Sequence, residues 1–357
     1  MSVALADTTA RRSAVFHSLA IARIDRLCAD AVAVTFDVPP EMADVFAFRA
    51  GQYLTLRLAE ERRSYSICAP VGAAPRIGVR LVADGVFSSW LVEHARPGDR
   101  IDVLPPLGNF TPTTTGRHAL IAAGSGITPV LSVAATLLAT DSANRVTLLY
   151  GNRRTDTVMF AEELADLKDS YLDRLQLVHV LSREPRDVEL FTGRLDADRI
   201  GRLVDTIVPS DVDHWWLCGP FGLVEAAGDV LAARGVPAER VHRELFYVDE
   251  PPPEPVRHDD TAPDGPVSEV TVVLDGRATT LTLPADGPIL DAAQRVRADL
   301  PFACKGGVCG TCRAKVTAGS VRMRRNYALE QHELDAGFVL TCQAVPTADQ
   351  VTVDYDA

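Results

Sequence analysis

The chain has no hydrophobic run of the length that a membrane-spanning helix needs, and its first eighteen residues show no apolar core followed by a cleavage site. Its seven cysteines are an odd number, so they do not predict the paired disulfide framework of a secreted protein. We therefore expect a soluble, cytoplasmic protein. A length of 357 residues leaves room for two or three domains, each with its own core.

The chain also lacks an excess of positive charge, with 48 acidic against 36 basic residues and a net charge of −12. A protein that neutralises nucleic-acid phosphates needs a basic face, so we expect no nucleic-acid partner. Part of the negative charge is local, because residues 249–265 contain six carboxylates and one arginine among several prolines. This composition predicts a stiff, solvated linker at 249–267 and a separate C-terminal domain at 268–357.

Four of the seven cysteines lie in this last domain, in the pattern Cys-x4-Cys-x2-Cys followed, after 29 intervening residues, by a fourth. The four are Cys304, Cys309, Cys312 and Cys342. Their spacing is typical of a plant-type [2Fe–2S] cluster, in which thiolates neutralise two ferric ions. The glycines between them permit tight turns and a close approach of main-chain N–H groups to the sulfurs. A structural zinc site is the alternative, although such sites usually offer two Cys-x2-Cys pairs and this chain offers one.

The residues around the cysteines predict regular structure. Residues 269–283 alternate around an Asp275-Gly276 turn and predict a hairpin, while residues 288–300 place an apolar face, Val296 included, on a helix. The segment from 268 to the end of the chain resembles the ferredoxin family, and this resemblance implies a β-grasp fold.

Short alternating segments separated by Gly, Pro and Asp turns fill residues 15–113 and predict an antiparallel β-barrel. Two of its stretches, "RRSYSI" at 62–67 and "DGVFSSWL" at 84–91, together resemble the flavin site of the ferredoxin–NADP reductase family. The resemblance implies FAD rather than the alternative FMN, because phosphate ligands come from two segments. It implies Arg63 on the pyrophosphate, Tyr65 stacked on the isoalloxazine and Ser66 beside N5, with further pyrophosphate contacts from Gly85, Val86 and Ser88.

Residues 114–248 alternate buried-type strands with helical stretches, which predicts an α/β domain with a parallel sheet. Such sheets bind ligands at the carboxyl ends of their strands. Glycine turns follow the first strand, at Gly124 and Gly126 before Thr128, and the last strand, at 218–220. Either turn alone is compatible with tight packing, whereas the pair favours a nucleotide site.

Both turns match the same reductase family. The resemblance implies that the first turn binds the pyrophosphate of NAD(P)H and that the loop of Cys218, Gly219 and Pro220 faces the nicotinamide. Ser66 and Cys218 are thus the predicted catalytic residues. Ser182 and Arg183 resemble family residues that bind a 2′-phosphate, and Arg153 lies in a position to assist, so we expect a preference for NADPH.

Together these motifs predict a path for electrons. A nicotinamide delivers two electrons as hydride, an iron–sulfur cluster accepts one at a time, and a flavin accepts two and releases them singly. No nucleophile–base arrangement and no di-iron carboxylate signature accompanies the path, so we expect the terminal chemistry on another protein. A stand-alone enzyme would need a further site, and a non-enzymatic iron–sulfur binding module would lack the flavin motifs.

The order of domains resembles the oxygenase reductases. The segment 304–357 is most similar to the reductase subunits of phenylacetyl-CoA epoxidases, which implies a di-iron oxygenase as partner. Reductases of ketosteroid hydroxylases, acyl desaturases and hybrid-cluster protein share the architecture and remain alternatives. The basic segment "RMRRN", with Arg322, Arg324 and Arg325, is either a solvated face or a docking patch beside the cysteine loop.

Overall fold

The computed structural model describes residues 15–357 except 60, 84, 247–266, 285 and 298. The described residues form two compact units, one within 18–252 and one within 253–357. The expected linker at 249–267 lies outside the described residues apart from its last position. Among the described residues, no helix is both long and apolar enough to cross a membrane.

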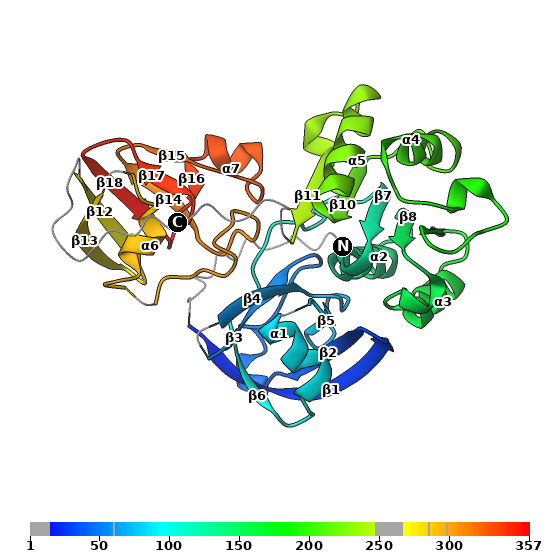
Figure 1. Ribbon diagram of the computed structural model, residues 1–357, viewed down its shortest axis with the longest axis horizontal. Helices are drawn as coiled ribbons and strands as arrows, with labels where there is room; N and C mark the ends of the chain where they lie inside the picture. Colours follow the sequence, from blue (N-terminus) through cyan, green and yellow to red (C-terminus); the bar gives the residue numbers. More distant parts are fainter. Residues whose placement is uncertain (1–14, 60, 84, 247–266, 285, 298) are drawn as a thin grey trace, which may run out of the picture. The chain divides into compact units, whose positions relative to one another are not determined.

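The first unit begins with an antiparallel barrel (Figure 1). Its strands are β1 (His17–Cys28), β2 (Ala31–Asp37), β3 (Tyr53–Leu58), β4 (Glu61–Ser66), β5 (Arg76–Arg80) and β6 (Arg100–Val103). They lie in the order β4-β3-β6-β1-β2-β5. The two end strands meet where Ile67 bridges Ile77 and the Cys68 N–H donates to the Arg76 carbonyl at 2.8 Å, so the sheet closes on itself. Alternating apolar residues fill its interior, as the sequence pattern predicts.

A parallel five-stranded sheet follows, in the order β11-β10-β7-β8-β9. Its strands are β7 (Arg117–Ala123), β8 (Arg145–Asn152), β9 (Leu175–Leu181), β10 (His214–Gly219) and β11 (Val241–Leu245). The helices of this α/β layer are α2 (Ile127–Thr140), α3 (Ala161–Ser170), α4 (Ala197–Thr206) and α5 (Phe221–Ala233). Because β7 and β10 are neighbours, the two glycine turns that follow them lie at the same edge of the sheet.

The barrel and the parallel sheet pack directly on each other. The Ser132 hydroxyl of α2 donates to the Ala69 carbonyl at 2.6 Å, and Arg76 of β5 forms an ion pair with Glu163 of α3 at 2.9 Å. The Arg76 guanidinium also lies 5.5 Å from the centre of the Phe160 ring. A Cβ on Gly78 would clash with Thr128 and Phe160, so a side chain at this position would separate the two layers.

The second unit contains a five-stranded sheet of order β13-β12-β18-β14-β16 and a two-stranded sheet, β15-β17. Its strands are β12 (Val267–Leu274), β13 (Arg277–Pro284), β14 (Arg313–Ala318), β15 (Val321–Met323), β16 (Phe338–Leu340), β17 (Ala344–Pro346) and β18 (Gln350–Asp354). Two short helices, α6 (Ile289–Ala293) and α7 (Gln331–Asp335), accompany them. The expected hairpin is present, and β18 pairs with β12 in parallel.

One helix is shorter than the sequence predicts. The apolar spacing favours a helix over 288–300, but α6 ends at Ala293 and turns with i to i−3 hydrogen bonds follow it. Val296, expected on the buried face, is 58% exposed. The regular helix ends early, so the apolar period at this point does not correspond to a continuous buried stripe.

Candidate functional site

The four cysteines of the second unit lie together as two pairs. The thiols of Cys304 and Cys309 are hydrogen-bonded to each other, and so are those of Cys312 and Cys342. The hydrogen bond with Cys309 and accepted main-chain N–H groups lower the pKa of Cys304 to about 6. The pKa of Cys309 is raised by the same bond and by burial, and that of Cys312 by its bond with Cys342 and by burial. Main-chain N–H groups therefore favour the thiolate form at Cys304, the form in which a cysteine binds iron.

The donor set fits a two-iron cluster better than a single metal ion. Two pairs of thiols offer two ligands to each of two irons. N–H groups already point at the sulfurs, from Gly306 to Cys304 at 3.3 Å and from the Gln343 side chain to Cys342 at 3.5 Å.

The basic segment at 322–326 lies against this loop. The Tyr327 N–H donates to the Gly307 carbonyl at 3.1 Å, and the Arg324 N–H donates to the Gln343 carbonyl at 2.9 Å. The Gln343 side chain donates in turn to the Lys305 carbonyl at 2.8 Å. Arg322 is exposed. The main chain of this segment thus lies beside the cysteine loop, while the Arg324 guanidinium donates to the Asp286 carbonyl at 2.6 Å.

In the barrel, β4 carries the expected flavin-binding residues. Tyr65 packs against the barrel core with its ring centre 5.9 Å from that of Phe87, and burial raises the pKa of its phenol. Arg63 is half exposed and pairs with Glu61 at 3.0 Å. Phe87 supports the Tyr65 ring from α1 (Val86–Ser89), the short helix that begins after Gly85.

The loop into α1 is closed by Ser88 itself. Its hydroxyl donates to the Gly85 carbonyl at 3.1 Å and accepts the Val82 N–H at the same distance. This side chain is buried, and its hydroxyl already forms hydrogen bonds within the loop. Val86 is 63% exposed, and Asp84 lies outside the described residues.

The structure brings the two glycine turns together. A Cβ on Gly126 would lie 2.3 Å from the Cys218 carbonyl oxygen, so only a glycine lets the first turn approach the end of β10 so closely. Gly124 has a φ of +56°, and its carbonyl accepts the hydroxyl of buried Tyr150 at 3.0 Å. Thr128 is buried and donates to the Ser125 carbonyl, which secures the start of α2.

Sequence reasoning missed Glu244, which lies between the two predicted catalytic residues. The Ser66 hydroxyl of the barrel donates to the Glu244 carboxyl at 2.8 Å, and Cys218 is the register partner of Glu244 across β10 and β11. Burial raises the pKa of Glu244 to about 8, and burial together with Glu244 raises the pKa of Cys218. The sequence signal that could have identified Glu244 is an acidic residue near the end of the strand that follows the Cys-Gly-Pro loop in the sheet.

Arg80, at the end of β5, is a second residue that sequence reasoning missed. It reaches from the barrel to the α/β layer, where it donates to the Thr157 carbonyl at 2.5 Å. One guanidinium nitrogen would lie 3.7 Å from a Cβ on Gly124. A cation therefore faces the first glycine turn, where a pyrophosphate is expected.

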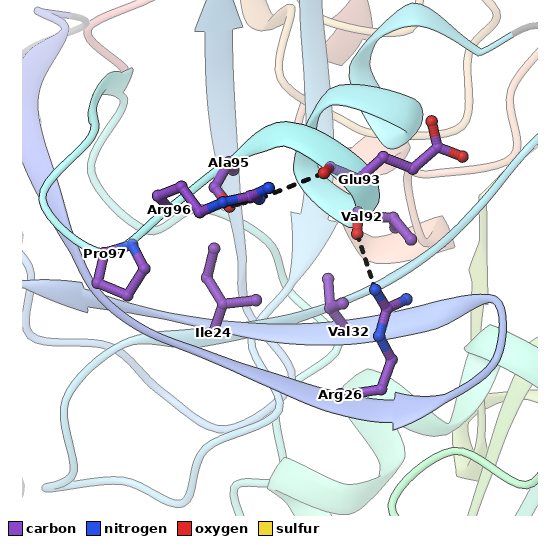
Figure 2. Close-up of a pocket in the computed structure, with 8 residues that line it drawn as sticks. All are labelled: Ile24, Arg26, Val32, Val92, Glu93, Ala95, Arg96 and Pro97. Atoms are coloured by element: carbon purple, nitrogen blue, oxygen red, sulfur yellow. Dashed lines mark hydrogen bonds between the residues drawn. The ribbon is translucent and has the colours of Figure 1, made fainter.

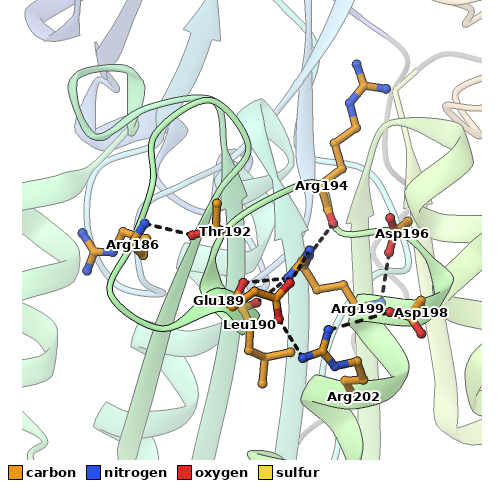
Figure 3. A network of polar contacts seen from close by, with 9 residues as sticks. All are labelled: Arg186, Glu189, Leu190, Thr192, Arg194, Asp196, Asp198, Arg199 and Arg202. Carbon is orange, nitrogen blue, oxygen red and sulfur yellow. Dashed lines mark hydrogen bonds and ion pairs between the residues drawn. The ribbon is translucent and has the colours of Figure 1, made fainter.

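The strand ends of β8 and β9 place Arg153 and Arg183 side by side, because the Arg183 N–H donates to the Arg153 carbonyl at 2.8 Å. Both side chains are exposed. In the neighbouring loop, Arg199 of α4 donates to the carbonyls of Glu189, Leu190 and Arg194 (Figure 3). The guanidinium of Arg194 points away from this network. The loop beside the expected 2′-phosphate site is thus held in place by its own helix.

A pocket of about 380 Å³ lies elsewhere on the barrel (Figure 2). It is lined by residues of β1, of β2 and of the segment after α1. Two of these residues, Arg26 and Arg96, donate to main-chain carbonyls. None of the predicted flavin or nucleotide residues lines it.

Three protein-family models match the chain in succession. They are the oxidoreductase FAD-binding domain at residues 18–111, the oxidoreductase NAD-binding domain at 120–229 and the 2Fe-2S iron-sulfur cluster binding domain at 272–347. Among solved structures, phthalate dioxygenase reductase superposes with a TM-score of 0.60 at 22% identity, over 95% of this chain and 98% of that one. These matches confirm the predicted fold class and the cofactors FAD, NAD(P)H and a [2Fe–2S] cluster.

Relatives of known activity match over nearly the whole chain. A subunit of 1,2-phenylacetyl-CoA epoxidase from Escherichia coli (strain K12) is 42% identical over 96% of this chain and 98% of its own length. The ferredoxin reductase component of 3-ketosteroid-9-alpha-monooxygenase from Mycobacterium tuberculosis is 39% identical over 90% of this chain and 88% of its own. The chain therefore belongs to the family of NAD(P)H-dependent flavin and iron–sulfur oxidoreductases that are the reductase components of oxygenases, a family that includes this epoxidase subunit.

Proposed function

We propose that this chain is the NADPH-dependent reductase of a cytoplasmic di-iron oxygenase that epoxidises the ring of phenylacetyl-CoA. The observation that carries the proposal is the 42% identity to an epoxidase subunit over almost the full length of both chains. The ketosteroid monooxygenase reductase, at 39% identity over a smaller share of both chains, supports the second candidate, a ring hydroxylase partner.

We propose domains at 15–113, 114–248 and 268–357, joined by the linker at 249–267. In the first two, FAD is held by Arg63, Tyr65 and the loop of Gly85, Val86 and Ser88. The NADPH pyrophosphate lies on the turn from Gly124 to Thr128, and its 2′-phosphate meets Ser182 and Arg183. In the third, Cys304, Cys309, Cys312 and Cys342 ligate the cluster.

Three residues position the hydride step. Ser66 would contact the flavin and Cys218 the nicotinamide, and Glu244, which accepts the Ser66 hydroxyl and pairs in register with Cys218, would connect them. Because its pKa lies near 8, Glu244 holds a proton at neutral pH and adds no negative charge beside the incoming hydride. Gly219 and Pro220 complete the loop that contacts the nicotinamide.

The electron balance agrees with an oxygenase partner. NADPH gives up two electrons as hydride and leaves as NADP⁺, and the electrons leave the chain singly through the cluster domain. The oxygenase uses both, with two protons, to reduce one atom of dioxygen to water while the other atom enters the ring.

Reconstitution tests the proposal. NADPH, this protein and the epoxidase components are expected to consume phenylacetyl-CoA and dioxygen in equal amounts, with omission of this protein as the control. Turnover with a ketosteroid hydroxylase and none with the epoxidase would reject the epoxidase as partner and leave the electron-transfer function standing.

A further inference from the structure

Beneath the cysteine loop, two hydroxyl groups connect the end of the chain to the cluster ligands. Thr341, fully buried, precedes Cys342, and its hydroxyl donates to the Cys312 carbonyl at 2.9 Å. The same hydroxyl lies 2.6 Å from the phenol oxygen of Tyr355. The Thr341 N–H also donates to the Cys312 carbonyl, at 3.1 Å.

The direction of this hydrogen-bond chain is fixed by its chemistry. A carbonyl oxygen only accepts, so the single proton of the Thr341 hydroxyl points to Cys312. The Tyr355 phenol must therefore donate to Thr341, and burial raises its pKa, which keeps that proton in place. Both O–H dipoles have their positive ends toward the main-chain carbonyl of Cys312, and hydrogen bonds in such a series strengthen one another.

The segment after β18 holds Tyr355 in position. The Tyr355 N–H donates to the Val273 carbonyl at 3.0 Å. The next residue, Asp356, accepts the N–H groups of Asp275 and Gly276 at 2.8 and 2.7 Å, which ties the segment to the turn of the β12–β13 hairpin. The phenol thus has a fixed place against the core of the unit.

We propose that the Tyr355–Thr341 hydroxyl chain is a positioning device for the iron–sulfur cluster, which holds two ligand segments in register and raises the reduction potential of the cluster. The inference rests on the proposed ligation by Cys312 and Cys342. Reduction adds negative charge to the cluster, and hydrogen bonds donated to the main-chain carbonyl of a ligand residue draw electron density from that residue, which favours the reduced form. The same hydrogen bonds tie Cys312 to Thr341, the residue before Cys342, so that neither ligand segment moves without the other.

Tyr355→Phe tests the proposal, because it keeps the ring and removes only the donor. We expect a lower midpoint potential in an EPR-monitored redox titration, and about tenfold faster loss of the visible cluster absorbance under an iron chelator, as for other partners of metal ligands. Thr341→Ser, which retains the hydroxyl, is expected to match the wild type in both measurements, and Thr341→Val to match Tyr355→Phe.

Thr271→Val is the matched control, since it removes one member of a hydroxyl pair of 2.8 Å on strands β12 and β13 away from the cysteines. It is expected to change neither quantity. A wild-type potential in Tyr355→Phe would overturn the proposal, whatever its melting temperature, because a merely structural role predicts that result. Cys312→Ser tests the ligand assignment on which the inference rests, because an unaltered EPR signal in that variant would show that Cys312 is not a ligand.

Discussion

Replacing Glu244 by glutamine is expected to make the protein less sensitive to alkaline conditions. The carboxyl accepts the Ser66 hydroxyl at 2.8 Å, while its second oxygen is buried without a partner among the described residues. Burial raises its pKa from the ordinary 4.5 to about 8. Glutamine has nearly the same shape, carries no charge and retains an oxygen that accepts from Ser66.

The sign and size follow from the two pKa values. As the pH rises above 4.5, the unfolded chain releases this proton while the folded chain keeps it until about pH 8, so stability decreases across that interval. At about 1.36 kcal/mol per pKa unit, the shift of 8 − 4.5 = 3.5 corresponds to a loss of about 5 kcal/mol at high pH. Between about pH 5 and about pH 8 the wild type is expected to lose about 3 kcal/mol that the variant does not.

Urea unfolding of the FAD-loaded protein at several pH values measures this difference, with flavin and far-ultraviolet signals followed together. The stability of Glu244→Gln minus that of the wild type should increase steadily with pH. Glu225→Gln, at a half-exposed glutamate that pairs with Arg243, is the control and should show no such trend. If the stability difference is instead constant across the pH range, Glu244 is ionised in the folded protein. That result would refute the proposal that its carboxyl stays protonated at neutral pH.

Three further predictions address the other sites. Cys312→Ala should abolish the EPR signal of the reduced cluster while FAD stays bound and NADPH still reduces it; zinc in place of iron in the native protein would contradict the ligand set. Arg183→Ala should lower kcat/KM for NADPH by about 10- to 100-fold and leave that for NADH nearly unchanged, since a hydrogen bond to a charged group contributes about 1.5–3 kcal/mol. Arg154→Ala, beside it but paired with Asp156, is the control, and equal losses for both nucleotides would count against a 2′-phosphate site. Arg322→Glu should slow association with the oxygenase and weaken its salt dependence, whereas exposed Arg277→Glu should not; identical behaviour of the two variants would exclude the basic segment from the interface.

The fold class and the cofactors were predictable because they depend on local patterns. Alternating segments, buried strands and the spacing from Cys304 to Cys312 each lie within a short stretch, and the family matches confirm the fold class and the cofactors that they predict. The helix predicted at 288–300 begins as expected but ends at Ala293, because apolar spacing does not show where turns replace the regular hydrogen bonds. The roles of individual residues in binding FAD and NADPH remain predictions.

Glu244 could not be identified from the sequence, because its role depends on a hydrogen bond with Ser66, which lies 178 residues away in the chain. On its own, "VHREL" is a short, mostly polar strand with no periodic signal. Its carboxyl becomes informative only when β11 is placed beside β10 and the barrel brings Ser66 to the same point. Arg80 is a similar case, since a strand-end arginine of the barrel gains significance only from its position by Gly124.

The site near Ser66 is therefore a property of how the barrel and the parallel sheet pack, rather than of either alone. Ser66 comes from the barrel, whereas Cys218 and Glu244 come from the two sheet strands that pair in register. The Arg76–Glu163 ion pair and the glycine at position 78, which admits no Cβ beside Thr128 and Phe160, hold these layers together. Hydride transfer requires reacting atoms about 3–3.5 Å apart, so a small shift at this packing interface changes the reaction geometry directly. We therefore expect substitutions at Arg76 or Gly78 to slow reduction by NADPH through a shift of the two layers.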